Sequence, residues 1–257
     1  MAAPTFFATG VLDSENSGTS ITPTPFPAGI ANNDIAVMGV GCGNAATTFT
    51  TPSGQGAWQV LGTSLVDAGQ STAWYWLRLT GSETSETVAT NVTFSNTNGG
   101  YGQLWVFRGC ITTGNPFEGV GNAGTVAETT PDTSACTTTG DDRLVVSIVQ
   151  IDNDFQTGWA SGNPPSGWST MGNAVTPPAN QGVVGDHLQW STIGSDWSTD
   201  AIQRTEASAT TVASAVVGTL SASTRWRTLT FALIPAPPAA PASLIPYRSP
   251  YRRVLAG

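Results

Sequence analysis

The chain has 257 residues, a formal net charge of −8 and only 10% charged residues, whereas a typical soluble domain has about 25%. It contains 38 Thr and nine Arg but no Lys, and 39% of its residues are hydrophobic. This composition excludes wholesale disorder and also a coiled coil or helical bundle, whose exposed faces need charge. The acidic balance disfavours nucleic-acid binding, because an acidic surface repels phosphate backbones.

Strand signals recur along the chain, and helix signals are nearly absent. Each strand signal is an apolar, aromatic or alternating run bounded by Gly, Pro, Asn or Ser, which supply turns. In chain order the runs are 35–40, 74–79, 88–94, 104–107, 144–149, 211–220 and 228–234. Many short strands separated in this way predict an all-β fold, namely an antiparallel, jelly-roll-like β-sandwich.

Similar features occur twice, which predicts two similar halves. The segment 33–37 has a counterpart at 141–146, and the turn before Trp58 has a counterpart before Trp168. A single repeat of this length is not a solenoid, which needs three or more short units. We therefore expect one body built from two halves, and two tandem β domains are the alternative.

The predicted organisation is a sandwich body followed by an extended arm. The body covers residues 1–235, with halves at about 1–125 and 126–235. Residues 236–257 begin with a Pro-rich linker, which favours an extended chain. They also reverse the charge, because the arm has a formal charge of +3 and the body one of −11.

The arm repeats the triplet Pro-Tyr-Arg at 246–248 and 250–252. Tyr and Arg are enriched at protein interfaces, and proline limits the freedom that is lost on docking. We therefore predict that the arm binds a partner; a frayed terminus and an arm folded back on its own acidic body are the alternatives. The predicted partner-binding residues are Tyr247, Arg248, Tyr251, Arg252 and Arg253.

The sequence offers little for catalysis. His187 is the only histidine, its neighbouring aspartate cannot orient it as a distant triad aspartate would, and no G-x-S-x-G elbow is present. The carboxylate pairs Glu83/Glu86 and Asp141/Asp142 could serve a glycosidase, but turn caps or strand starts are expected of them. We therefore predict no enzyme activity, no catalytic residue and no cofactor.

No metal site is predicted either. Cys42, Cys110 and Cys136 are an odd set without close spacing, which indicates buried or half-buried thiols and neither a disulfide framework nor a zinc site. Asp152 and Asp154 flank an asparagine and could contact calcium. Their segment lacks the glycine and glutamate of an EF-hand loop, so an Asx turn is expected there.

The nine tryptophans fall into two groups. Those in or beside strand signals are predicted to lie in the core or at interfaces, and they are Trp58, Trp74, Trp76, Trp105, Trp168 and Trp226. Trp159, Trp190 and Trp197 lie among Gly, Ser and Asp and are candidates for exposed loop aromatics. Exposed rings of this kind could stack on sugars, which leaves a carbohydrate-binding module as an alternative function.

The sequence gives no sign of membrane insertion or export. No stretch approaches the ~20 apolar residues of a membrane helix, and the N-terminus lacks a basic segment followed by a long apolar run. The expectation is a chain that is made and folded in a cytoplasm and has no membrane partner.

Several features together resemble a known family. They are a buried strand begun by an aspartate (34–40), a Pro-to-Trp turn (52–58), an aromatic strand (74–79), an Arg-Gly strand ending (106–109) and a second half that closes on Ala-Leu-Ile-Pro (232–235). The pattern resembles the jelly-roll-like β-sandwich minor virion proteins of tailed bacteriophages, and it covers most of the body.

The resemblance implies a non-enzymatic virion structural protein. A capsid decoration, or cement, protein is expected first, a tail or fibre-associated protein second, and a module that binds host-surface glycan third. The implied partner is the major capsid protein or another virion protein, and the implied assembly is a homotrimer. The implied location is the virion, after synthesis in the host cytoplasm. The family has no defining catalytic residues, so none is transferred.

Overall fold

The computed structural model is all-β. It describes residues 1–10, 12–15, 17–22, 26–43, 46–54, 56–66, 69–83, 92–95, 99–152, 164–171, 181–184, 188–191, 197–220 and 223–238. The regular elements in these ranges are strands, and most of them pair antiparallel in two seven-stranded sheets. None of the described segments forms a helix that could cross a membrane.

The first sheet comes from the first half of the chain. Its long strands lie in the order β1-β9-β4-β7, and they are β1 (Thr5–Thr9), β4 (Asn32–Gly43), β7 (Gln70–Thr80) and β9 (Gly100–Arg108). Three short strands extend it: β2 (Asp13–Glu15) pairs with β9, and β5 (Gln59–Val60) and β6 (Leu65–Val66) pair with β7.

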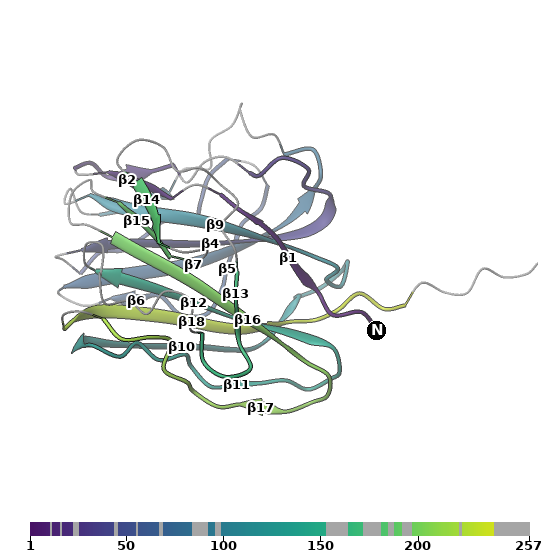
Figure 1. Ribbon diagram of the computed structural model, residues 1–257. Helices are drawn as coiled ribbons and strands as arrows, with labels where there is room; N and C mark the ends of the chain where they lie inside the picture. Colours follow the sequence, from purple (N-terminus) through teal and green to yellow (C-terminus); the bar gives the residue numbers. More distant parts are fainter. Residues whose placement is uncertain are drawn as a thin grey trace, which may run out of the picture.

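The second sheet comes from the second half. Its long strands lie in the order β10-β18-β12-β16, and they are β10 (Phe117–Glu128), β12 (Arg143–Asp152), β16 (Trp197–Glu206) and β18 (Thr224–Leu233). Three short strands lie on the β16 side: β13 (Ser169–Thr170), β14 (Gln181–Val184) and β15 (Leu188–Ser191). Figure 1 shows the two sheets face to face, with β4, β7 and β9 above β10, β12 and β18.

The two halves repeat one arrangement, because β1, β9, β4 and β7 have the same order as β10, β18, β12 and β16. Each half also has a two-stranded sheet: β3 (Ser20–Ile21) with β8 (Val92–Thr93), and β11 (Cys136–Thr137) with β17 (Thr211–Val212). The predicted boundary near residue 125 falls inside β10, the first strand of the second sheet. The antiparallel sandwich is confirmed, but a jelly-roll connection is not, because each sheet draws its strands from one half alone.

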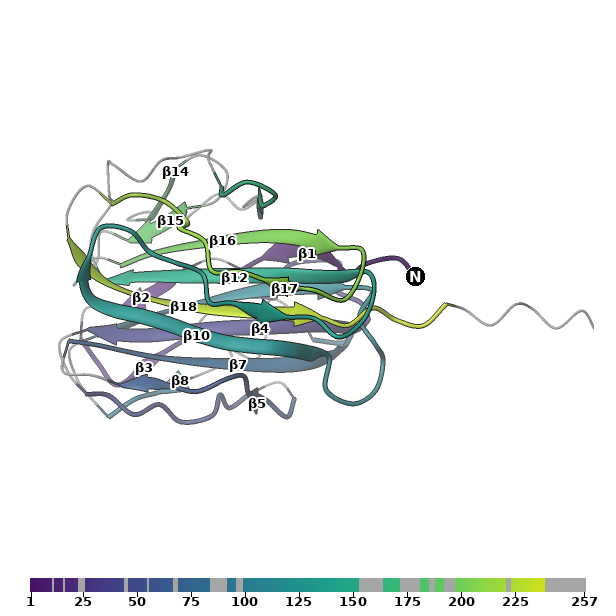
Figure 2. The ribbon, with the colours of Figure 1, turned by 90° about the horizontal axis from the view of Figure 1, so that it is seen from below.

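The central strands of each sheet are buried on both faces. Between the sheets, Ile35 and Val37 of β4 and Trp76 of β7 belong to one apolar cluster with Val146 and Phe231 of the second sheet. Side chains that alternate with these point outward into two further clusters, which the two-stranded sheets cover. Figures 1 and 2 show β11 and β17 lying across the outer face of the second sheet. Strands buried on both faces read as continuous apolar runs, which explains the sequence signals at 35–40 and 144–149.

One end of the space between the sheets is polar. Gln150 of β12 is fully buried, and neither atom of its side-chain amide has a hydrogen-bond partner among the described residues. Gly39 of β4 makes room for it, because a Cβ there would lie 2.5 Å from the Trp74 ring and 2.9 Å from Gln150 Nε2. On β9, Gln103 is equally buried, but its Nε2 donates to Thr9 Oγ1 (3.0 Å) and to Gly10 O (3.3 Å).

Candidate functional site

Many of the predicted site residues lie outside the described residues. They are Trp159, His187, Glu86, Asp154 and the arm residues Tyr247, Arg248, Tyr251, Arg252 and Arg253. The body itself continues past its predicted end at Pro235, because Ala236 N donates to Gly109 O (2.8 Å) and Ile234 N donates to Pro116 O (2.9 Å). These bonds attach the end of β18 to the segment that joins the two sheets.

The tryptophan predictions have a divided outcome. The six tryptophans predicted for the core or interfaces are all buried, with exposed fractions between 0% and 7%. The loop placement of Trp190 and Trp197 was wrong, because Trp190 pairs with Gly182 and Ser198 inside the second sheet and Trp197 pairs with Asp152. Polar neighbours in the sequence indicated loops there, but strand pairing at the β16 edge of the sheet outweighs that local preference.

The three cysteines are free and buried, as predicted. Burial raises the pKa of Cys110 to about 12 and that of Cys136 to about 11. A thiolate is the form that attacks an electrophile or binds a metal. At neutral pH these two side chains are therefore protonated and act as small apolar groups.

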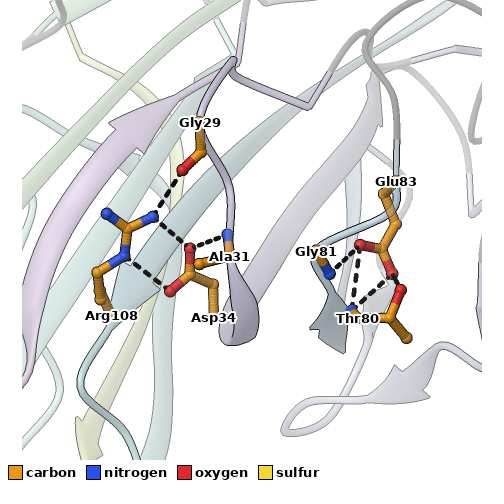
Figure 3. A network of polar contacts seen from close by, with 7 residues as sticks. All are labelled: Gly29, Ala31, Asp34, Thr80, Gly81, Glu83 and Arg108. Atoms are coloured by element: carbon orange, nitrogen blue, oxygen red, sulfur yellow. Dashed lines mark hydrogen bonds and ion pairs between the residues drawn. The ribbon is translucent and has the colours of Figure 1, made fainter.

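Asp34 at the start of β4 is held by an ion pair. Arg108 Nε donates to Asp34 Oδ1 (2.9 Å), and Arg108 Nη2 donates to Asp34 Oδ2 (2.7 Å) and to Gly29 O (2.8 Å). The Arg108 guanidinium also lies 3.9 Å from the centroid of the Phe7 ring. Hydrogen bonding to Asp34 raises the pKa of Arg108. Figure 3 shows this contact, which joins the end of β9 to the start of β4.

Glu83 caps the turn after β7, as expected from the sequence. Its carboxylate accepts hydrogen bonds from the backbone N–H groups of Thr80 (2.8 Å) and Gly81 (2.9 Å) and from Thr80 Oγ1 (2.9 Å). Burial raises the pKa of Glu83, but these hydrogen bonds outweigh that effect and leave the pKa below its ordinary value. Figure 3 shows Glu83 folded back over Thr80 and Gly81, so its role there is structural.

The second half has a similar contact at the start of β12, with the charges reversed. Arg143 Nε donates to Glu118 Oε1 (2.6 Å), and Glu118 also accepts hydrogen bonds from the backbone and hydroxyl of Thr139 (3.0 and 2.6 Å). Burial raises the pKa of Glu118, but the hydrogen bonds from Arg143 and Thr139 outweigh this effect and leave the pKa below its ordinary value of 4.5. Both halves therefore use a charged pair to fix the start of a central strand.

An open groove of about 550 Å³ lies on the outer side of the second sheet, beside β10. The chain leaves β10 at Glu128 and runs back over the sheet. Backbone hydrogen bonds between residues 129–133 and 215–220 hold it there. Ser134 N then donates to Thr230 Oγ1 (3.0 Å), which holds this segment above β18. The groove between it and the sheet is lined by Asn122, Ala123, Gly124, Glu128, Asp132, Thr133, Ser134, Ala135, Ser214 and Trp226.

Four side chains in this groove have a polar atom with no hydrogen-bond partner among the described residues. These atoms are the Oδ1 atoms of Asn122 and Asp132, the hydroxyl of Ser134 and the indole Nε1 of Trp226. Ser134 is 8% exposed and Trp226 is 3% exposed. A polar atom that is buried without a hydrogen-bond partner lowers stability by about 1–3 kcal/mol. A ligand that forms hydrogen bonds with these atoms would recover part of this free energy. Sequence reasoning missed this set because Trp226 is far along the chain from Asp132 and Ser134, and the set matches no motif.

A smaller hollow of about 210 Å³ lies between β1 and β16. Its charged residue, Arg204, is already paired with Glu206 and lies 5.7 Å from the centroid of the Trp168 ring. The groove beside β10 is therefore the better candidate for ligand binding. Comparisons with known protein families, curated proteins and solved structures found no match for this chain.

Proposed function

We propose that this chain is a non-enzymatic structural protein of a bacteriophage virion, and within that class a capsid decoration protein. The proposal starts from the sequence resemblance, whose aspartate-initiated strand, Pro-to-Trp turn and Arg-Gly strand ending lie in the body. A tail or fibre-associated protein is the second candidate. The partner would be the major capsid protein or another virion protein, and the protein would reside in the virion.

The observation that carries the proposal is how the body uses its arginines. Arg108, Arg143 and Arg204 pair with carboxylates, and Arg78 donates to the backbone carbonyls of Ile111 and Gly114 in the segment between the sheets. Burial lowers the pKa of Arg78, and the two carbonyls hold its guanidinium in place. In an enzyme, ionisable groups typically converge on a cleft, whereas these four arginines fasten strand ends and the crossover.

Three of the nine arginines, Arg248, Arg252 and Arg253, lie in the arm. Because the body's own cations are largely engaged, the arm is the basic segment best suited to contact an acidic partner. Each guanidinium can bind a carboxylate with two parallel hydrogen bonds. We expect the arm to anchor the protein and the sandwich to form a compact block on the particle surface.

Electron microscopy of virions that contain the protein tests this proposal. Density of the size of the sandwich on the capsid lattice, repeated around threefold axes, is the expected result, and it would also support the proposed homotrimer. Density confined to the tail would favour the second candidate. Absence of the protein from purified virions would refute the proposal.

A further inference from the structure

We infer that the groove beside β10 binds a neutral oligosaccharide. This inference goes beyond the proposed virion role, and it rests on the four polar atoms without partners among the described residues and on the charge of the groove. The hydrogen bonds that Asn122, Asp132, Ser134 and Trp226 can still make define what the ligand must offer.

The four groups need partners of different kinds. The Asn122 and Asp132 oxygens only accept, the Trp226 indole N–H only donates, and the Ser134 hydroxyl does both. A sugar hydroxyl donates one hydrogen bond and accepts others, so the several hydroxyls of a short oligosaccharide can serve both the acceptors and the donor. A lysine or arginine side chain and a metal cation accept no hydrogen bond, and they would leave the Trp226 N–H without a partner.

The charge of the groove selects against acidic ligands. Its lining includes the carboxylates of Glu128 and Asp132, and the described lining residues include no basic side chain. Phosphates, uronic acids and nucleic acids would be repelled in this setting. A polar ligand without charge avoids this repulsion and can also accept a hydrogen bond from the Trp226 N–H.

The shape of the groove fits a short oligosaccharide. Its volume of about 550 Å³ lies within the range of about 300–1,000 Å³ that is usual for small-ligand sites. Ala123 and Gly124 give the sheet side a low, apolar floor, and residues 132–135 form a polar wall opposite. Gly121 lets this wall approach β10, because a Cβ there would lie 3.1 Å from Ser134 Cβ.

The test follows the Trp226 indole N–H by NMR in the isolated full-length chain, with the indole labelled with nitrogen-15 and EDTA present. The probes are maltotriose, cellotriose, chitotriose and mannotriose, and Trp226→Phe identifies the signal. We expect at least one sugar to shift this signal in a saturable way. Ser134→Ala should weaken binding about tenfold, because it removes a buried hydrogen bond. Asp132→Asn should also weaken binding about tenfold, because it replaces a charged acceptor with a weaker neutral one.

Asp141→Asn is the matched control, since Asp141 is an exposed carboxylate at the opposite end of the second sheet, and it should leave the affinity unchanged. No response to any of the four sugars would overturn the inference, as would binding that Ser134→Ala and Asp132→Asn leave intact. A shift produced only by a peptide of residues 244–257 would also overturn it and would assign the groove to basic peptides. Because no particle is present, these outcomes do not bear on the virion proposal.

Discussion

Asn33 and Asp142 occupy the same position in the two halves of the sandwich. Both have a left-handed backbone, with φ of 70° and 57°. Each directly precedes the charged residue, Asp34 or Arg143, that fixes the start of a central strand. Asn and Asp tolerate this conformation better than most residues. Both halves therefore start a central strand in the same way, with a residue in the left-handed conformation followed by a charged residue in an ion pair.

The first prediction concerns the Asp34–Arg108 pair. Arg108→Ala should lower the free energy of unfolding by about 2 kcal/mol, because the Asp34 carboxylate, only 2% exposed, would lose its charged hydrogen bonds. Arg108→Lys keeps the charge but not the two-pronged contact, so it should lose less. Urea denaturation of the three proteins measures both values. Equal midpoints for the alanine variant and the parent would contradict this account.

The second prediction concerns the pH dependence of the Glu118–Arg143 pair. The pKa of Glu118 in the folded protein lies below its ordinary value of 4.5. The ion pair therefore stabilises the fold above pH 4.5, and this contribution is lost as the pH falls through the folded-state pKa. Glu118→Gln should be less stable than the parent at neutral pH, and the difference should vanish in strong acid. A difference that stays constant across a pH series of unfolding curves would disprove the assignment.

The third prediction compares the two buried glutamines. Gln150→Met should raise the free energy of unfolding by about 1 kcal/mol, because it removes an amide without partners at nearly constant shape. Gln103→Met should lower it by about 1 kcal/mol, because Thr9 and Gly10 would lose a hydrogen-bond donor. Urea denaturation measures both. Destabilisation by Gln150→Met would mean that the amide has partners, such as buried water.

The fourth prediction compares two left-handed glycines. Gly114 has a φ of 72°, and a Cβ there would have no atom within 4 Å, so Gly114→Ala should lower stability by about 1 kcal/mol through backbone strain alone. Gly119 has a φ of 61°, and a Cβ there would lie 2.5 Å from Thr137 O. Gly119→Ala should therefore cost about 3 kcal/mol. Thermal unfolding separates the two, and equal losses would argue against close packing of β10 on β11.

The sequence predicted well those strands that are buried on both faces. The runs at 35–40, 104–107, 144–149 and 228–234 lie within β4, β9, β12 and β18, apart from Ile234. The predicted strand at 211–220 was wrong beyond Val212. There Val217 and Leu220 are buried, but their N–H groups bond to Pro131 and Thr129 in irregular backbone.

The strand that forms the groove was not predictable from its composition. β10 is rich in glycine, and its pairing with β18 shifts register twice, which breaks the alternation that signals a strand. The groove depends on these irregularities and on a long-range approach of residues 132–135 to Trp226. Nothing in the local sequence specifies such an approach, because tertiary packing decides it.

We propose that the sandwich folds without its C-terminal arm and that the arm anchors it to a phage particle. The most direct test is sedimentation of purified empty particles with the full chain and with a chain truncated after Pro238, which keeps the bonds at Ile234 and Ala236. We predict that the truncated protein melts close to the parent but no longer sediments with particles. Full-occupancy binding of the truncated protein, or failure of the full chain to bind, would contradict the claim.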